Sequence, residues 1–103
     1  MTAVPRLLDE IHPGEILLHE FLKPLCISEA QLARDLGVPL VEVRALVRGE
    51  LALSVEMALR LGLFFSMEPR FWLSLQCEFD MRTAIRKRRQ EISGQVRICA
   101  LTA

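Results

Sequence analysis

The feature that most constrains the fold is the stretch ARDLGVPLVEVRALVRG, residues 33–49, in which a glycine separates two short segments with helical spacing of apolar residues. Two helices that cross over so tight a turn need a small residue where they approach, a turn residue tolerant of positive φ, and apolar residues that hold the pair together. Ala33 and Gly37 meet the first two needs. Five apolar residues meet the third: Leu32, Leu36, Val38, Val43 and Leu46. The stretch therefore predicts a helix-turn-helix.

Apolar spacing and capping residues predict five helices in the whole chain, and they predict no membrane span. Pro13 and Pro69 each stand near the first turn of a helix. Ser28 and Ser54 have the character of N-caps, and Gln31 follows Ser28 at the spacing of a capping box. The predicted helices cover approximately residues 13–24, 28–36, 39–47, 54–65 and 69–91.

A chain of 103 residues is long enough for one domain with one core. We expect an N-terminal arm over residues 1–12, a helix-turn-helix domain over 13–92 and a C-terminal tail over 93–103. Within the tail, residues 95–101 alternate weakly, which leaves a short strand and a disordered segment both open. The hydrophobic content of 51% predicts a well-filled helical core, with apolar surface left for a protein partner.

The cysteines and the N-terminal sequence indicate a reduced, cytoplasmic protein. Cys26, Cys77 and Cys99 are far apart and form no CxxC pair, so each is expected to be a small buried hydrophobic residue. No N-terminal stretch has the basic and then apolar layout of a signal peptide. We therefore expect a cytoplasmic location.

Metal binding and catalysis find little support in the residue pattern. His12, Glu15 and His19 have spacings that could place them on one helix face. No third strong ligand lies near the two histidines, however. No nucleophile with a base, phosphate-binding glycine loop or pair of catalytic carboxylates is present. We expect no metal, no cofactor and no enzymatic activity.

The second helix of the helix-turn-helix has an unusual surface for a DNA reader. Its exposed residues should contact base edges in the major groove. Arg44 is suited to a bidentate contact with guanine, and Leu40 and Val41 are suited to thymine methyl groups. Glu42 would accept from cytosine but repel phosphates. DNA binding and a role as a scaffold for protein interaction both remain open.

The charge count of the helix-turn-helix region argues against DNA binding. Between residues 28 and 61 there are four basic and five acidic residues, a net charge of −1, whereas DNA binding favours a positive face. The basic run at residues 86–89 is expected to be a solvated helix end, favourable at the negative end of the helix dipole. DNA phosphates and the acidic side of a partner remain alternatives for it.

The chain resembles the HigA-type antitoxins of bacterial type II toxin–antitoxin modules over about residues 11 to 81. The resemblance rests on HPGEIL at 12–17, LGVP at 36–39, MALRL at 57–61 and FWLSLQ at 71–76. It implies an all-α, five-helix, lambda-repressor-like helix-turn-helix domain that forms a homodimer. It also implies that the protein neutralises an mRNA-cleaving toxin and represses its own operon by binding operator DNA.

Residues for these roles follow from the resemblance and from the chemistry above. The expected DNA contacts are Gln31, Leu40, Val41, Arg44 and Arg48. The expected dimer interface, which would also contribute to the core, is Phe71, Trp72, Leu75 and Phe79.

Departures from the family pattern fall at two kinds of position. Leu40, Val41 and Glu42 stand where the family usually has polar or basic residues, and Glu50 stands where it usually has a basic one. Cys26 and Ser66 stand where the family usually has glycine. These two substitutions put the local turn geometry in doubt, but not the fold.

Overall fold

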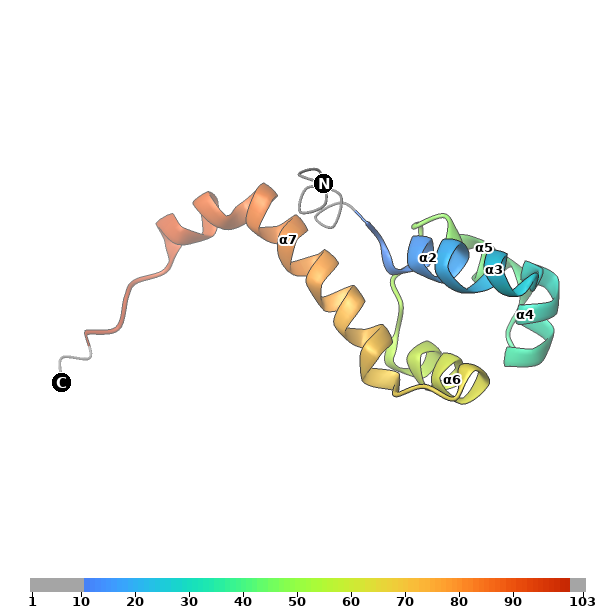
Figure 1. The fold of residues 1–103 in the computed structure, drawn as a ribbon. Coiled ribbons are helices and arrows are strands. Elements are labelled where there is room, and N and C mark those ends of the chain that lie inside the picture. The colour runs from blue at the N-terminus through green and yellow to red at the C-terminus, as the bar shows by residue number, and fades with distance from the viewer. Residues whose placement is uncertain (1–10, 101–103) are drawn as a thin grey trace.

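The protein is all-α, as predicted, and the computed structural model describes residues 11–100 (Figure 1). Among these residues there is no strand. Most of the predicted N-terminal arm, 1–12, lies outside the described residues. The helical segments are α2 (Pro13–Ile16), η1 (Leu17–Leu22), α3 (Lys23–Leu25), α4 (Glu29–Leu36), α5 (Leu40–Val47), α6 (Val55–Phe65) and α7 (Pro69–Gln95). Because α2, η1 and α3 follow one another without a break, residues 11–100 form five helical rods, in agreement with the prediction.

The first rod runs through Pro24, which was predicted to limit it, and ends one residue later at Leu25. A proline inside a helix lacks an N–H to donate, and its ring crowds the carbonyl four residues before it. In η1 the backbone widens into a π-helix, in which the N–H of Lys23 donates to the carbonyl of Leu18, five residues back. This wider turn directly before Pro24 accommodates the proline ring and lets the rod continue.

The core lies where the first rod, the helix-turn-helix, α6 and the start of α7 meet. Trp72 is its largest side chain and is fully buried. Four of the five residues predicted to hold the helix pair together are buried, and Val38 packs against them half-buried, which confirms that prediction. The buried hydrophobic residues are Leu17, Leu22, Leu32, Ala33, Leu36, Val43, Leu46, Val47, Leu53, Met57, Ala58, Leu61 and Trp72.

Gly14 is the point of closest approach between α2 and α5. A Cβ atom added to Gly14 would lie 1.8 Å from the carbonyl oxygen of Leu46. That oxygen belongs to the backbone, so no side-chain movement would relieve the clash. The glycine therefore lets the first rod rest directly on the backbone of α5.

His12 caps the first rod through its ring nitrogen. Its Nδ1 accepts a hydrogen bond of 2.9 Å from the N–H of Gly14, and its ring packs edge-on against Phe79 with centroids 5.0 Å apart. Burial lowers the pKa of His12 below its ordinary value, although Asp80 and Glu15 oppose the shift. The side chain is thus used in the fold, and among the described residues no three metal-binding side chains gather.

Four helical rods end on a residue in the left-handed conformation, or directly before one. Gly37 and Gly49 have φ values of 75° and 77°, and Cys26 and Ser66 both have 56°. After each of the two non-glycine residues the chain closes with the expected bond, from Ile27 N–H to the carbonyl of Leu22 (2.9 Å) and from Met67 N–H to that of Gly62 (2.8 Å). The turn geometry is therefore kept without glycine.

The three cysteines were predicted to be buried, and this was wrong. Cys26 is exposed at its turn, Cys77 is exposed on α7, and Cys99 is exposed in the segment after it. A turn residue with φ of 56° points its side chain away from the helix that it ends, which explains the exposure of Cys26.

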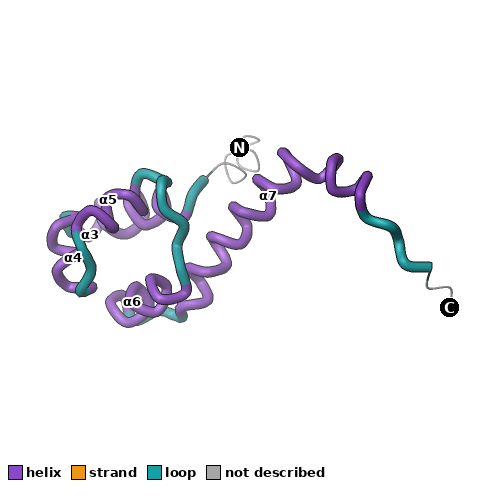
Figure 2. The backbone as a smooth tube through the Cα atoms, turned by 180° about the vertical axis from the view of Figure 1, so that it is seen from behind, coloured by secondary structure: helices purple, strands orange, loops and turns teal. Residues whose placement is uncertain are grey.

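The last helix extends well beyond the rest of the molecule. α7 has 27 residues and ends at Gln95, four residues beyond the predicted end, and residues 96–100 form no strand. Its first half packs on α6 and on α2, whereas its second half projects away from the other helices (Figures 1 and 2). No helix in the described part of the chain is both long enough and apolar enough to cross a bilayer.

We expect Cys26→Gly and Ser66→Gly each to stabilise the protein by about 0.5–1 kcal/mol, because relief of the left-handed strain of an L-residue exceeds the entropy that glycine adds to the unfolded chain. Urea unfolding followed by circular dichroism measures the change. Ser66→Ala is the matched control and should bring no gain, since alanine keeps the strain. A loss of stability in both glycine variants would contradict the assignment.

Candidate nucleic-acid interface

The candidate interface is built on α4 and α5, which meet at the turn around Gly37. The N–H groups of Gly37 and Val38 both donate to the carbonyl of Ala33, at 3.0 and 3.1 Å, and so satisfy the end of α4. Pro39 then stands as the N-cap of α5 in an extended conformation. Val43 and Leu46 turn one side of α5 into the core, which leaves the opposite side to solvent.

The solvent face of α5 carries three of the predicted contact residues. Val41 is 72% exposed, and Arg44 and Arg48 are exposed as well. Leu40 is half-buried and packs against the core, so it offers less surface than Val41. Glu42 is also half-buried. The outward surface of the helix is therefore one apolar side chain flanked by two arginines, with a carboxylate beside them.

Arg44, the predicted guanine reader, has a partner in the protein itself. Its Nε lies 3.8 Å from a carboxylate oxygen of Glu29, in the first turn of α4. Arg44 is exposed and Glu29 is partly exposed, so solvent screens the pair and it contributes little to stability. A contact of Arg44 with a base would nevertheless have to replace this pair. Sequence spacing did not reveal it, because the two residues lie on different helices.

Gln31 and Arg48 occupy the outer parts of the motif. Gln31 is exposed on α4, and its backbone N–H donates to Ser28 Oγ at 3.0 Å, as the capping pattern predicted. Arg48 is the C-cap of α5 and has no ion-pair partner among the described residues. The structure thus places Arg48 at the opposite end of α5 from Pro39.

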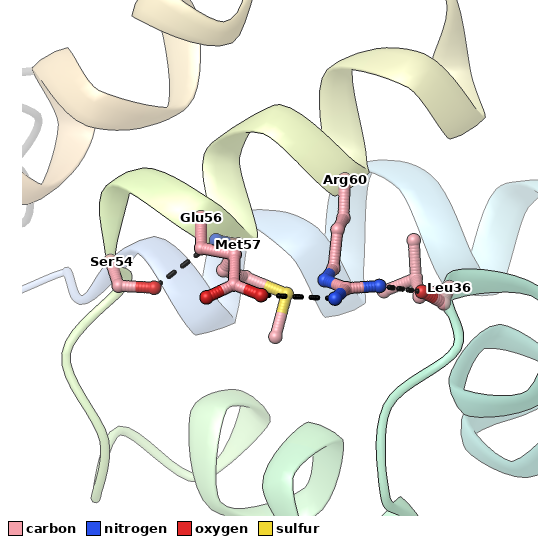
Figure 3. A network of polar contacts seen from close by, with 5 residues as sticks. All are labelled: Leu36, Ser54, Glu56, Met57 and Arg60. Carbon is pink, nitrogen blue, oxygen red and sulfur yellow. Dashed lines mark hydrogen bonds and ion pairs between the residues drawn. The ribbon is translucent and has the colours of Figure 1, made fainter.

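Arg60 of α6 is a positioning residue that the sequence analysis counted only as a charge (Figure 3). One guanidinium nitrogen donates to the carbonyl of Leu36 at 2.6 Å, and another pairs with Glu56 at 2.9 Å. The bond to Leu36 satisfies one of the last carbonyls of α4 and ties the turn to α6. Because this arginine is occupied, fewer basic side chains in the motif are available for DNA phosphates.

The four predicted dimer residues mostly face the body of the same chain. Trp72 is fully buried, so its place in a dimer seam is corrected: it belongs to the core alone. Leu75 packs partly buried against the core, and Phe79 contacts His12. Phe71 keeps 37% of its surface exposed beside Trp72, with ring centroids 5.1 Å apart. This side of α7 is where the helix joins its own domain.

The chain is a helix-turn-helix protein of the DNA-binding type. Its two helices are packed together by buried side chains, Gly37 closes the turn between them in the left-handed conformation, and one face of α5 points to solvent. No family model matches it. It is similar to the Pseudomonas aeruginosa antitoxin HigA solved with the higBA promoter, with 41% identity and a TM-score of 0.81 over 84% of this chain and 95% of that one. The antitoxin GraA in complex with its operator gives 44% identity and a TM-score of 0.84 over 89% and 93%. Virulence-associated protein I of Dichelobacter nodosus is 38% identical over 74 residues, which are 72% of this chain and 68% of that protein.

The chain belongs to the HigA-type antitoxins. The identities hold over nearly the full length of the solved relatives, and two of these were solved on promoter or operator DNA.

We expect Arg60→Met to destabilise the protein by about 1–2 kcal/mol, because it leaves the carbonyl of Leu36 without its charged donor while keeping the apolar stem. Thermal unfolding measures the change. Arg34→Met, on the exposed side of α4, is the control and should change stability by less than about 0.5 kcal/mol. Equal effects of the two substitutions would show that Arg60 has no positioning role.

Proposed function

We propose that the chain is the antitoxin of a type II toxin–antitoxin module, acting in the cytoplasm as a homodimer. It binds operator DNA through α5 and represses its own operon. It also binds and neutralises an mRNA-cleaving toxin, and it has no catalytic activity of its own.

The observation that carries the DNA-binding part is the exposed face of α5. A buried helix pair holds this face outward, and the side chains on it are ones that reach base edges and phosphates. Arg44 would read a guanine, Val41 and the exposed part of Leu40 would contact thymine methyl groups, and Arg48 would contact a phosphate. Gln31 would add a contact from α4. Two relatives in complex with promoter or operator DNA support this use of the same fold.

The toxin-binding part is supported by the family and by apolar surface that folding does not use. Val55, Leu59 and Leu63 follow one another at single-turn spacing along α6, and all three are exposed, Leu63 by 83%. Exposed apolar stripes of this kind mark protein contacts. An all-helical antitoxin that binds a protein as well as DNA accounts for this surface.

A second candidate is a helix-turn-helix protein that has lost DNA binding and keeps only protein contacts. The pair between Arg44 and Glu29 and the half-buried Glu42 favour it, because both oppose an approaching phosphate backbone. The two candidates differ in one measurable property, the affinity for the protein's own promoter.

We expect modest affinity for that promoter, with the two α5 helices of the dimer roughly 34–36 Å apart. Arg44→Ala should lose about 1–3 kcal/mol of binding free energy at one base position, whereas Arg48→Ala should weaken binding to all sequences alike.

Glu42→Arg should tighten binding to any duplex and steepen its salt dependence. Replacing thymine by uracil at the positions under α5 removes the methyl groups. This should weaken DNA binding by the wild type and should weaken binding by the Val41→Ala variant less. Fluorescence anisotropy measures each effect.

Glu29→Gln is the matched test of the internal pair. It removes the competing carboxylate without touching α5, so it should tighten binding in a way that depends on Arg44. If the wild type binds no duplex at low salt, and Glu42→Arg creates no binding, the second candidate is correct.

The toxin-binding part predicts a growth phenotype. Co-expression of this chain should relieve the growth arrest caused by the product of the neighbouring gene, and Leu63→Asp tests whether the α6 stripe takes part. Arg48→Ala serves as the control, because a phosphate contact has no role in binding a protein. Continued arrest with both proteins soluble would show that the chain is not the antitoxin of that toxin.

A further inference from the structure

The first turn of α5 carries an acidic side chain that the proposed DNA contacts do not use. Glu42 is half-buried beside the exposed Val41, and within the described chain its carboxylate makes no ion pair or hydrogen bond. It borders a polar hollow of about 240 Å³ that Glu56 and Arg60 also line, and these two residues pair with each other. The Glu42 carboxylate is therefore an open hydrogen-bond acceptor in the turn that the proposed function places in the major groove.

The outward side chains of α5 offer little other hydrogen-bonding chemistry. Helical spacing places four residues on the side opposite to the buried one: Val41, Arg44, Ala45 and Arg48. The two arginines carry only donors, and the other two side chains carry only methyl groups. The base features that this face can bind are therefore the acceptors of guanine and the C5 methyl groups of pyrimidines.

Val41 is the side chain best placed to reach a C5 methyl group. It is 72% exposed in the first turn of α5, and the N-terminal residues of a recognition helix are the ones that contact base edges. Its β-branched side chain is restricted at χ1, so it loses little rotamer freedom on contact. Burying one methyl group against it should change affinity about fourfold.

Thymine and 5-methylcytosine carry this methyl group at the same place on their major-groove edge. They differ at the neighbouring atom, because thymine presents the O4 acceptor whereas 5-methylcytosine presents the N4 amino donor, as cytosine does. A carboxylate beside Val41 would accept from the amino group and would be repelled by O4. The neighbouring Val41 and Glu42 therefore match two groups of 5-methylcytosine, but only one group of thymine or of unmethylated cytosine.

We propose that α5 binds 5-methylcytosine in the major groove, with Val41 on its C5 methyl group and Glu42 accepting from its N4 amino group. This inference rests on the proposed function, since it requires α5 to enter the major groove of operator DNA. It adds a ligand class to that function and makes operator binding depend on cytosine methylation. Because a dimer has two half-sites, one added methyl group under each α5 should raise affinity about fifteenfold.

Promoter duplexes with matched bases test the methyl contact. Each pyrimidine of the bound site is set in turn to cytosine or to 5-methylcytosine, symmetrically in both half-sites and always opposite guanine. At one position in each half-site, methylation should tighten wild-type binding about fifteenfold in fluorescence anisotropy, and it should change the Val41→Ala variant less than about threefold. A wild-type affinity that is the same with and without the methyl group at every position would overturn the proposal.

Glu42→Gln tests the amino contact. Glutamine has the same size, but its amide carries a donor as well as an acceptor, so it can bind thymine O4 as well as an amino group. The wild type should prefer 5-methylcytosine to thymine at the sensitive position about tenfold more strongly than Glu42→Gln does. Comparing the two proteins on the same duplexes cancels the contribution of the opposite base, which also changes.

Glu50→Gln is the matched control for the loss of a negative charge. Glu50 is exposed in the loop after α5, so this variant reduces the repulsion of phosphates without touching the first turn of the helix. It should tighten binding to all duplexes alike and keep the wild-type preference for 5-methylcytosine. The same preference in the wild type and in Glu42→Gln would refute the role of Glu42.

Failure of this inference and failure of the proposed function are separable. A wild type that binds its promoter equally well with and without methylation keeps the operator-binding function and loses the inference. A wild type that binds no duplex, methylated or unmethylated, at low salt removes the DNA-binding function and the inference together.

Discussion

The contact on which the rest of the structure depends is the one between Gly14 and the backbone of α5 at Leu46. Because no side chain separates the two helices there, the first rod sets both the position and the tilt of α5. His12 caps the same rod and packs on Phe79, so α7 is located by the same junction. The outward face of the recognition helix is therefore determined by a contact on its opposite side, remote from any DNA.

Local chemistry was enough to predict most of the fold. Gly37, Ala33 and their apolar neighbours specify the helix pair through spacing alone, and capping serines mark helix starts correctly. The face of α7 was harder to predict, since apolar residues occur on both of its sides, and only the packed structure shows that Trp72 points inward. Pairs that join distant segments were also invisible to spacing. Gln76, which accepts from Leu53 N–H at 2.7 Å and donates to Asp80, is one of these.

The residues of the candidate interface could be chosen from the sequence, but the contacts that its arginines make within the protein could not. The exposed side chains of α5 follow directly from helical geometry once the buried side is known. The restraint on Arg44 by Glu29 and the use of Arg60 as a cap of α4 depend on interhelical distances. Both lower the positive potential of the motif below what its arginines suggest. In the proposed DNA complex, the apolar Val41 would therefore contribute more of the sequence reading than the same position does in a protein with a polar recognition helix.

The separation of charge along the chain gives a neutral protein a large electric dipole. Residues 11–81 carry six basic and ten acidic residues, whereas residues 82–97 carry six basic and one acidic. Opposite ends of two such molecules attract before any side chains touch, so encounters are aligned head to tail within about a Debye length.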